Sequence, residues 1–292
     1  LGVTLEHPYP SSDRSEGLAN IMLDALSDVR QPLTVERLMQ WHRWLFNDPD
    51  WTMQRLRIGQ LRGSEPMQVV SGRLDYPKVH FEAPPREGLD ESLNTFIVWF
   101  NQSLNDSLLD PLLRAGITHL WFVTLHPFDD GNGRITRTLT DLALAQMDEQ
   151  SIRLYAMSTA ILNKRKSYYE ILEQTQKNDS DITDWLVWFL DTLNDSLEKT
   201  LAQINRTLFK SQFWHKYSNL ALSEGQRKVL NRLLDGGENG FEHGISASQY
   251  QKVAKISKAT ATRHLSDLLE KECIVKLEGG GRNTRYQINT QL

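Results

Sequence analysis

The sequence contains little cysteine, no long apolar run and no excess of basic charge. Its single cysteine, Cys273, cannot form an intramolecular disulfide or a cysteine-only metal site, which favours a reducing compartment. No apolar stretch approaches the roughly 18 to 20 residues that a membrane-spanning helix needs. The first residues lack the basic start and the apolar centre of a signal peptide. These absences predict a cytoplasmic protein that does not enter a membrane.

The charge is distributed unevenly along the 292 residues. The chain has 33 Lys and Arg against 37 Asp and Glu, a net charge of −4, which argues against a general polyanion binder. Residues 1–221 hold 22 basic and 29 acidic residues, whereas residues 222–292 hold 11 basic and 8 acidic residues. With 39% apolar residues, the chain can bury two cores. The opposite charge balances predict two parts with different partners.

The first part is predicted to be mostly helical. Apolar residues recur at helical spacing over 17–26, 34–46, 91–104 and 111–126. The stretch 66–85 instead has β-prone residues around a turn, which predicts a short hairpin. A long amphipathic helix over 181–217 is expected to connect the two parts.

The segment His126–Arg137, HPFDDGNGRITR, holds the residues that indicate chemistry. A histidine leads a loop with two acids and two glycines, and a helix is expected to begin directly after the loop. Glycines let backbone N–H groups point at a ligand, and a helix start adds the positive end of its dipole, so the loop suits an anion. Arg134 and Arg137 lie one turn apart on that helix, and their guanidinium forks match phosphate oxygens. Beside phosphates, a carboxylate such as Asp130 commonly binds Mg²⁺.

This segment resembles the signature of the Fic family, H-x-F-x-[D/E]-G-N-G-R-x-x-R, at every defined position. The resemblance extends over most of the first part of the chain, with a helical core, a hairpin before the motif and a tyrosine-rich helix after it. It implies adenylyl transfer (AMPylation), in which the hydroxyl of a protein Ser, Thr or Tyr attacks the α-phosphate of ATP and pyrophosphate leaves. The acceptor would be another protein or the enzyme itself.

The resemblance also implies a role for each motif residue. His126 would take the proton from the attacking hydroxyl, Asp130 would hold Mg²⁺ between the α- and β-phosphates, and Phe128 would anchor the loop in the core. The residues expected to bind the triphosphate are Gly131, Asn132, Gly133, Arg134 for the β-phosphate and Arg137 for the γ-phosphate. The phosphorylating Doc proteins have Lys in place of the second glycine, so Gly133 favours adenylyl over phosphoryl transfer.

Two further segments correspond in position to parts of the family's site. The hairpin corresponds to the flap, which aligns an extended target by strand addition and therefore demands little target sequence. The flap residues expected to contact the target are Val69, Val70, Ser71 and Gly72. Tyr168 and Tyr169 correspond to tyrosines on the adenosine side of the pocket. An ordinary surface hairpin and ordinary core tyrosines are the alternatives.

An inhibitory helix with the pattern [S/T]-x-x-x-E-[G/N] silences many Fic enzymes, and residues 12–17 match it with Glu16 as the inhibitory residue. The alternative is that Glu16 is a helix-start acid, which suits the helix dipole. In that case the inhibitory helix is expected before Leu1, and this chain would be constitutively active. The chain begins with Leu1 rather than Met, which predicts that it is a fragment of a longer protein.

The basic C-terminal part resembles a winged helix-turn-helix, with three helices followed by a hairpin. Its third helix is expected to start after Ser257, a plausible N-cap. The residues expected to face DNA are Lys258, Thr260 and Arg263 on that helix and Arg282 and Arg285 on the wing. Docking of a protein partner is the alternative use of this module.

The sequence therefore predicts a mainly α protein: a Fic helical core with a β-hairpin flap over 1–205, a helical linker over 206–222 and a small α+β winged-helix domain over 223–292. The expected enzyme is a protein adenylyltransferase that uses ATP and Mg²⁺. Two alternatives stay open: a DNA-binding regulator with a nucleotide-sensing Fic-like core, and a Fic-type enzyme that removes AMP. A homodimer is also left open.

Overall fold

The structure is a computed structural model that describes residues 13–46, 56–73, 76–148, 157–177, 181–236, 241, 243–278 and 284–291. Contacts divide the chain into two units, Leu1–Leu197 and Glu198–Leu292. Among the described residues, no helix combines the length and the apolarity needed to cross a bilayer.

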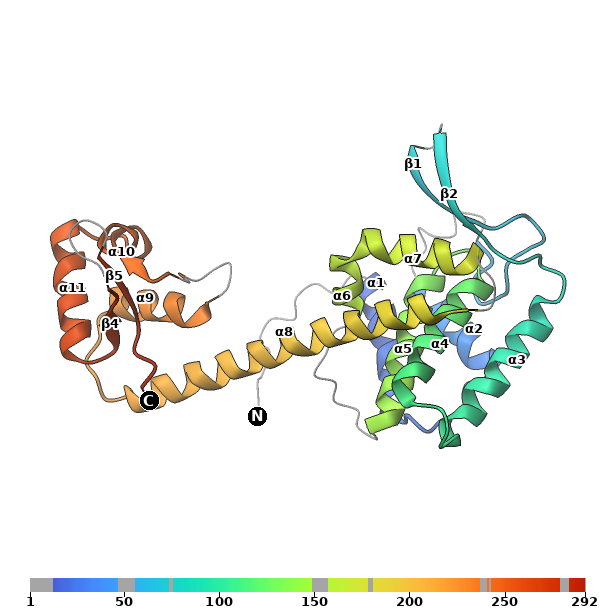
Figure 1. Ribbon diagram of the computed structural model, residues 1–292, viewed down its shortest axis with the longest axis horizontal. Helices are drawn as coiled ribbons and strands as arrows, with labels where there is room; N and C mark the ends of the chain where they lie inside the picture. Colours follow the sequence, from blue (N-terminus) through green and yellow to red (C-terminus); the bar gives the residue numbers. More distant parts are fainter. Residues whose placement is uncertain are drawn as a thin grey trace. The chain divides into compact units, whose positions relative to one another are not determined.

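The first unit is built from helices and one hairpin (Figure 1). Its helices are α1 (Asp13–Ser27), α2 (Val35–Leu45), α3 (Leu89–Gln102), α4 (Pro111–Leu125), α5 (Asn132–Asp148), α6 (Met157–Asn163), α7 (Arg165–Lys177) and the N-terminal part of α8 (Thr183–Lys216), with a 3₁₀ turn at Ser103–Asn105. The helices expected over 17–26, 34–46, 91–104 and 111–126 are confirmed.

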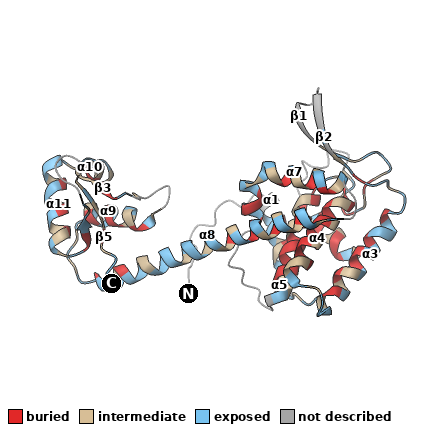
Figure 2. Ribbon diagram, viewed as in Figure 1, coloured by how far each residue is buried: buried red, intermediate tan, exposed pale blue. Residues whose placement is uncertain are grey.

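Helices α4 and α5 pack together at the centre of this unit, where the buried residues concentrate (Figure 2). Phe122 on α4 and Leu139 on α5 are fully buried, and Phe96 on α3 packs against Phe122 with ring centroids 5.6 Å apart. Trp185 of α8 covers the same core and donates a hydrogen bond from Nε1 to the Gly116 carbonyl at 2.9 Å. This packing fixes the α4–α5 connection, which is the motif loop.

Local sequence explains where the central helices begin and end. Thr34 caps α2 by accepting a hydrogen bond from the backbone N–H of Arg37 at 3.1 Å. Asp110 caps α4, and Pro111 occupies the first turn, where its missing N–H would have no helical partner. Helix α4 ends at His126, which adopts a left-handed conformation with φ 48° and ψ 56°.

The predicted hairpin is present as β1 (Gln68–Arg73) and β2 (Tyr76–Glu82), which pair antiparallel. Figure 1 shows it projecting away from the helices of its unit. The register shifts between Val69 and Val70, and Val70, Ser71 and Gly72 pair with residues 79, 78 and 77. Because this sheet has two strands, each strand has one edge that the other does not cover.

The second unit contains the rest of α8 with α9 (Glu224–Asp235), α10 (Ala247–Ala254) and α11 (Lys258–Glu270), and the strands β3 (Ile245–Ser246), β4 (Ile274–Lys276) and β5 (Arg285–Ile288). The strand order is β3-β5-β4, and both pairings are antiparallel. Ser223, Ser246 and Ser257 cap the three helices as N-caps. Strand β3 was not anticipated, because two residues are too few to give a period-2 pattern.

The stretch 206–222, assigned to a linker from sequence, forms the end of α8 and the turn after it. Phe213 and Tyr217 are buried there with Val229 and Leu265 of the second unit's core. The unit boundary lies between Leu197 and Glu198, inside α8. Periodicity predicts the long helix well, but it cannot say at which turn the packing partner of that helix changes.

Candidate active site

His126 lies at the end of α4, and one of its two ring nitrogens is hydrogen-bonded to the backbone. Its Nδ1 lies 3.1 Å from the Val123 carbonyl. A carbonyl only accepts, so Nδ1 carries the proton and Nε2 keeps its lone pair in the neutral ring. Burial lowers the pKa of His126 below its usual 6.5, and the nearby Arg62 adds to the lowering. The ring is therefore a neutral base at neutral pH, with Nε2 as the basic atom.

The loop after His126 leads directly into the N-terminus of α5. Gly131 has φ 83°, in the left-handed region, and a Cβ atom there would lie only 3.0 Å from the Phe46 ring. Helix α5 begins with Asn132 and Gly133, whose backbone N–H groups lie in the first turn, where donors lack helical acceptors, while the Arg134 N–H donates to the Gly131 carbonyl at 3.0 Å. This loop is therefore suited to bind an anion.

The side chain of Asn132 is used inside the loop. Its side chain is 2% exposed, donates from Nδ2 to the Phe128 carbonyl at 2.8 Å and accepts the Phe128 N–H at 3.0 Å. The amide side chain thus closes the loop on itself, and only the backbone N–H of Asn132 is left to face a phosphate. Phe128 is fully buried, as its predicted anchoring role requires.

Asp130 and Arg134 lie together at the outer side of the loop. The Asp130 carboxylate is 51% exposed, accepts the Gly131 N–H at 2.5 Å and lies 3.7 Å from Arg134 Nη2. The Arg134 guanidinium stacks 4.9 Å from the Phe46 ring centroid. A half-exposed carboxylate beside an anion-binding helix start has the chemistry of a Mg²⁺ ligand shared with phosphates.

Arg137 lines two cavities, one of which also contains His126. The first, of about 140 Å³, is lined by His126, Gly133, Arg137, Tyr168, Tyr169 and residues of the hairpin and α7. The second, of about 320 Å³, shares Arg137 and both tyrosines and extends to α6. A Cβ atom on Gly133 would lie 3.4 Å from Arg137 Nη1, so this guanidinium reaches back to the start of α5. The structure thus brings Tyr168 and Tyr169 to the pocket that also contains the base and Arg137.

Tyr168 is held by a hydrogen-bond chain whose direction the backbone sets. Thr140 Oγ1 donates to the Thr136 carbonyl at 2.8 Å, so it accepts from His119 Nδ1 at 2.9 Å. His119 Nε2 is then the acceptor, and the Tyr168 hydroxyl donates to it at 3.0 Å. Burial lowers the pKa of His119 to about 3, which keeps the ring neutral. His119 is therefore a core histidine with both nitrogens paired.

Replacing Tyr168 by Phe is expected to destabilise the protein by about 1–3 kcal/mol, because His119 Nε2 would remain buried without a donor. Thermal unfolding monitored by circular dichroism measures the change. Tyr169→Phe is the control: Tyr169 is partly exposed, so water can replace lost hydrogen bonds there. Equal unfolding temperatures for Tyr168→Phe and the unmodified chain would contradict the assigned chain.

Three residues outside the motif brace the loop, and sequence reasoning missed their contribution. Arg62 donates to the His126 carbonyl at 2.9 Å, and His42 Nε2 donates to the Asp130 carbonyl at 3.1 Å. The Gly59 N–H donates to His42 Nδ1 at 2.9 Å, which leaves the proton of the neutral ring on Nε2. Asp129 accepts the Arg57 N–H at 3.0 Å. No local pattern signals these contacts, because they join the stretch before the hairpin to a loop far along the chain.

The hairpin reaches the base directly. Phe81 of β2 lies with its ring centroid 6.4 Å from that of His126, and Val69 of β1 lines the same cavity. The side chains of Val70 and Ser71 lie outside the described part of the structure, although the backbone pairing of Val70, Ser71 and Gly72 is defined. The flap assignment therefore depends on the backbone edge and on Val69.

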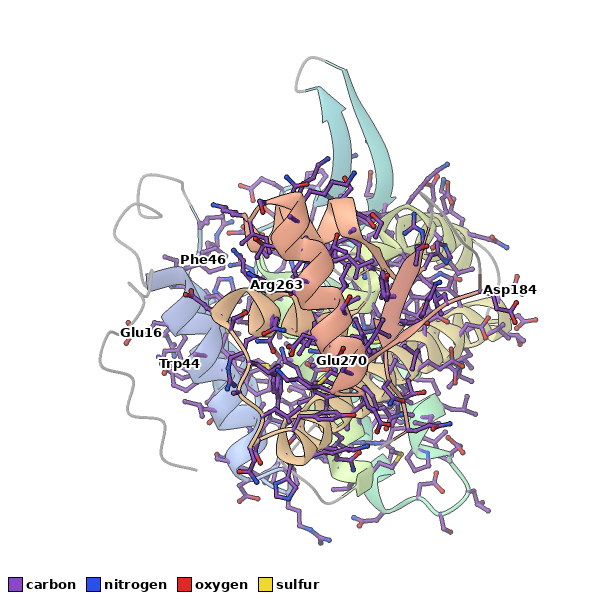
Figure 3. The ribbon with its side chains drawn as sticks, turned by 90° about the vertical axis from the view of Figure 1, so that its left-hand side faces the viewer. Glu16, Trp44, Phe46, Asp184, Arg263 and Glu270 are labelled. Carbon is purple, nitrogen blue, oxygen red and sulfur yellow. The ribbon has the colours of Figure 1, made fainter. Side chains whose placement is uncertain are left out.

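Glu16 lies in the first turn of α1 and is exposed. Figure 3 labels it together with Trp44 and Phe46 at the end of α2. A Cβ atom on Gly17 would lie 1.9 Å from the Trp44 carbonyl oxygen, so the close packing of α1 on α2 requires glycine after Glu16. Further along α1, Met22 Sδ lies 3.9 Å from Thr138 Oγ1 of α5. The element that carries Glu16 is thus packed against both the motif helix and α2.

In the second unit, the residues predicted to face DNA lie on α11 and β5. Lys258 and Arg263 are exposed on α11, and Figure 3 labels Arg263 there. Thr260 is half-buried, and its hydroxyl lies 2.9 Å from that of Ser257. Arg285 donates to the Gly244 carbonyl at 2.9 Å, which commits part of its guanidinium to the sheet. Arg282 lies outside the described residues.

The fold and the loop define a mainly helical domain with an anion-binding loop at the start of its central helix. Residues 32–144, which include this loop, match the family model described as Fic/DOC family.

Curated relatives match a part of the chain. The protein adenylyltransferase fic-1 of Caenorhabditis elegans is 29% identical over 119 residues, which are 41% of this chain and 20% of the relative. The protein adenylyltransferase Fic of Nematostella vectensis is 31% identical over 96 residues, 33% of this chain and 21% of the relative. The matches thus span about a fifth of these relatives' own length.

A solved structure resembles the chain over nearly its whole length. The crystal structure of a Fic family protein from Desulfovibrio desulfuricans G20 has a TM-score of 0.51 at 19% identity, and the match covers 97% of this chain and 77% of the other. At this identity the likeness shows the fold alone, and it confirms the predicted mainly helical Fic fold.

Proposed function

We propose that this chain is a protein adenylyltransferase that transfers AMP from ATP to a protein hydroxyl. The observation that carries the proposal is that one cavity joins three features: the unprotonated Nε2 of His126, the start of α5 at Gly133 and the guanidinium of Arg137. The base suits the hydroxyl, while the helix start and the arginine suit phosphates. The names of the matching relatives support the same activity.

The transfer step follows from these positions. As the hydroxyl oxygen forms its bond to the α-phosphorus, its proton passes to His126 Nε2. The bond from that phosphorus to the bridging oxygen breaks, and its electron pair leaves with pyrophosphate. Arg134 and Arg137 offset the charge on the leaving group, in the way that arginine clamps assist phosphoryl transfer.

The residues present fit a Mg²⁺ ion that is bound together with the triphosphate. The described residues contain no group of three or more His, Cys, Asp or Glu side chains that could enclose a metal. Mg²⁺ is commonly held by one or two carboxylates plus phosphates, and the half-exposed Asp130 offers one carboxylate beside the helix start. Asp130 would hold the ion, which would supply charge neutralisation to the triphosphate when bound.

The reaction is tested with two labels on ATP. We expect label on the α-phosphate to appear on protein and label on the γ-phosphate to remain in pyrophosphate, because the proposed attack is at the α-phosphorus. Mass spectrometry of the labelled chain and of a labelled lysate would identify the modified hydroxyl. Transfer of the γ-label instead would replace adenylyl transfer by phosphoryl transfer.

We propose Glu16 as an inhibitory residue, since α1 packs against α5 and carries the inhibitory pattern. Glu16→Gly is expected to raise automodification severalfold, measured as α-label incorporated per minute. Glu91→Gly is the matched control, because Glu91 is an exposed first-turn acid of α3 without the pattern. Equal rates for Glu16→Gly and the unmodified chain would leave Glu16 as a helix-start acid.

The second unit has the helix and strand order of the proposed winged helix-turn-helix, and its exposed Lys258 and Arg263 favour DNA as one ligand of this module. A gel-shift series with duplex DNA in rising salt tests this use, since binding through phosphates weakens steeply with salt. Absence of binding at low salt would leave the protein-docking use.

His126→Ala separates a nucleotide-sensing regulator from an enzyme, because only the enzyme needs the base.

A further inference from the structure

A single buried arginine, Arg62, ties the catalytic histidine to the base of the hairpin. Arg62 is 3% exposed and lies between α2 and β1. Its Nε donates to the His126 carbonyl at 2.9 Å, and its Nη2 donates to the Pro84 carbonyl at 2.5 Å. Its backbone N–H donates to the Pro127 carbonyl at 2.9 Å. One residue therefore contacts both ends of the space in which a hydroxyl would meet the base.

The carbonyl that Arg62 binds at the motif loop is at a sensitive point. His126 ends α4 with φ 48°, a conformation that residues other than glycine adopt at some cost. Its carbonyl belongs to the end of a helix, where acceptors lack helical donors. The guanidinium supplies that donor and so holds the peptide from which the imidazole extends.

The other carbonyl lies just beyond the hairpin. Pro84 follows β2, which ends at Glu82, and the Ala83 N–H continues the ladder to the Met67 carbonyl at 2.8 Å. Arg86, two residues further on, donates from Nε to the Arg62 carbonyl at 3.0 Å. Arg62 thus fixes where the hairpin leaves the body of the domain.

We propose that Arg62 is a positioning residue that sets the hairpin in register with His126, so that a hydroxyl held by strand pairing on the flap reaches Nε2. The inference depends on the proposed adenylyl transfer and deepens it. Errors of about 1 Å in such placement lower rates by as much as roughly a hundredfold. The Arg62 guanidinium is positively charged, although the groups that accept its hydrogen bonds are neutral carbonyls. Its charge also disfavours protonation of His126.

Other charged groups near His126 come from the elements that surround it. Asp130 comes from the motif loop, while Arg137 of α5 and Glu173 of α7 line the same cavity. Phe81 of β2 adds an apolar ring. Removing the Arg62 charge leaves this balance more negative, so the pKa of His126 should rise and the base should become protonated at a higher pH.

The test compares Arg62→Met and Arg62→Lys in the full chain. Both variants should lower α-label transfer at saturating ATP by about tenfold or more, while the KM for ATP changes by less than about twofold, because Arg62 is placed on the hydroxyl side. The acid limb of the pH profile should move to higher pH in Arg62→Met and stay in place in Arg62→Lys, which keeps the charge.

Arg114→Met is the matched control. Arg114 is also 3% exposed and donates to Ser103 Oγ at 2.9 Å and the Phe100 carbonyl at 2.7 Å, near the opposite end of α4 from His126. Its loss should lower the unfolding temperature and leave the acid limb unchanged. If transfer by Arg62→Met falls only in proportion to its unfolded fraction, or keeps the wild-type acid limb, Arg62 is merely structural.

A measurement without turnover separates this inference from the proposed function. The pKa of the His126 imidazole is read by NMR titration in the unmodified chain and in Arg62→Met. We expect a higher pKa in the variant, and an unchanged value overturns the inference. Absence of label transfer by the unmodified chain would instead remove the proposed function, and the register role with it.

Discussion

Replacing His126 by Ala is expected to lower AMP transfer by about a hundredfold to ten-thousandfold, the range that a positioned general base contributes. Without Nε2, the described part of the motif loop offers the cavity no neutral base that can accept the proton. The hydroxyl would then have to attack while still protonated. ATP binding should persist, because the start of α5 and Arg137 are left intact. Incorporation of α-label at pH 7 measures the loss.

The His126→Ala variant should also remain folded. Among the described residues, the imidazole makes one hydrogen bond, to the carbonyl of Val123, whereas the backbone of His126 is held by Arg62 and by its own N–H, which donates to the Phe122 carbonyl at 3.2 Å. His215→Ala is the control, since His215 is exposed in the second unit. Label transfer that persists at the unmodified rate in His126→Ala would refute the base.

Much of the fold follows from local sequence because local rules act on contiguous residues. Thr34, Ser246 and Ser257 stand before apolar-periodic runs, and each caps its helix. Pro111 marks the first turn of α4 in the same way. The hairpin was predictable from β-prone residues on both sides of a turn, and only the shift of register at Val69 was not, since pleat alternation alone does not signal a bulge.

The motif residues could also be predicted from the sequence, because the loop and the helix start that they form are contiguous in the chain. The residues that brace the motif loop could not be predicted in this way. Arg62 and His126 are 64 positions apart, and His42 and Asp130 are 88 positions apart. Burial and hydrogen-bond partners at such separations depend on how α2, α4 and the hairpin pack, which no window of sequence contains. His42 is buried in the core, and its contact with the Asp130 carbonyl also supports the loop.

The reading of Asn132 shows a related limit. The resemblance to the Fic signature implies that Asn132 belongs to the residues that bind the triphosphate. The structure commits both ends of its amide to Phe128, so its side chain organises the loop instead. A residue type and a spacing define what a side chain can bind, while competition from the neighbouring backbone decides what it does bind.

Replacing Arg137 by Ala is expected to lower AMP transfer by about a hundredfold, the scale on which loss of one clamp on developing charge acts. Arg137 reaches back to Gly133 and lines both cavities, so in the proposed reaction its guanidinium would face the triphosphate and the pyrophosphate that leaves. Arg137→Lys should recover only part of the rate, because an ammonium group cannot form the bidentate contact. Both rates are measured with α-labelled ATP.

The two arginines of the motif helix should differ in this test. The charge of Arg134 is partly offset by the Asp130 carboxylate at 3.7 Å, and its guanidinium stacks on the Phe46 ring. Because Arg134→Ala removes this ion pair, it also frees the Asp130 carboxylate to bind Mg²⁺. Loss of Arg137 has no such compensation and should raise the KM for ATP as well as lower kcat, because the same contact binds the substrate and the leaving group. An Arg137→Ala chain with unchanged kcat and KM would show that its guanidinium turns away from the triphosphate. The start of α5 would then hold the phosphates alone.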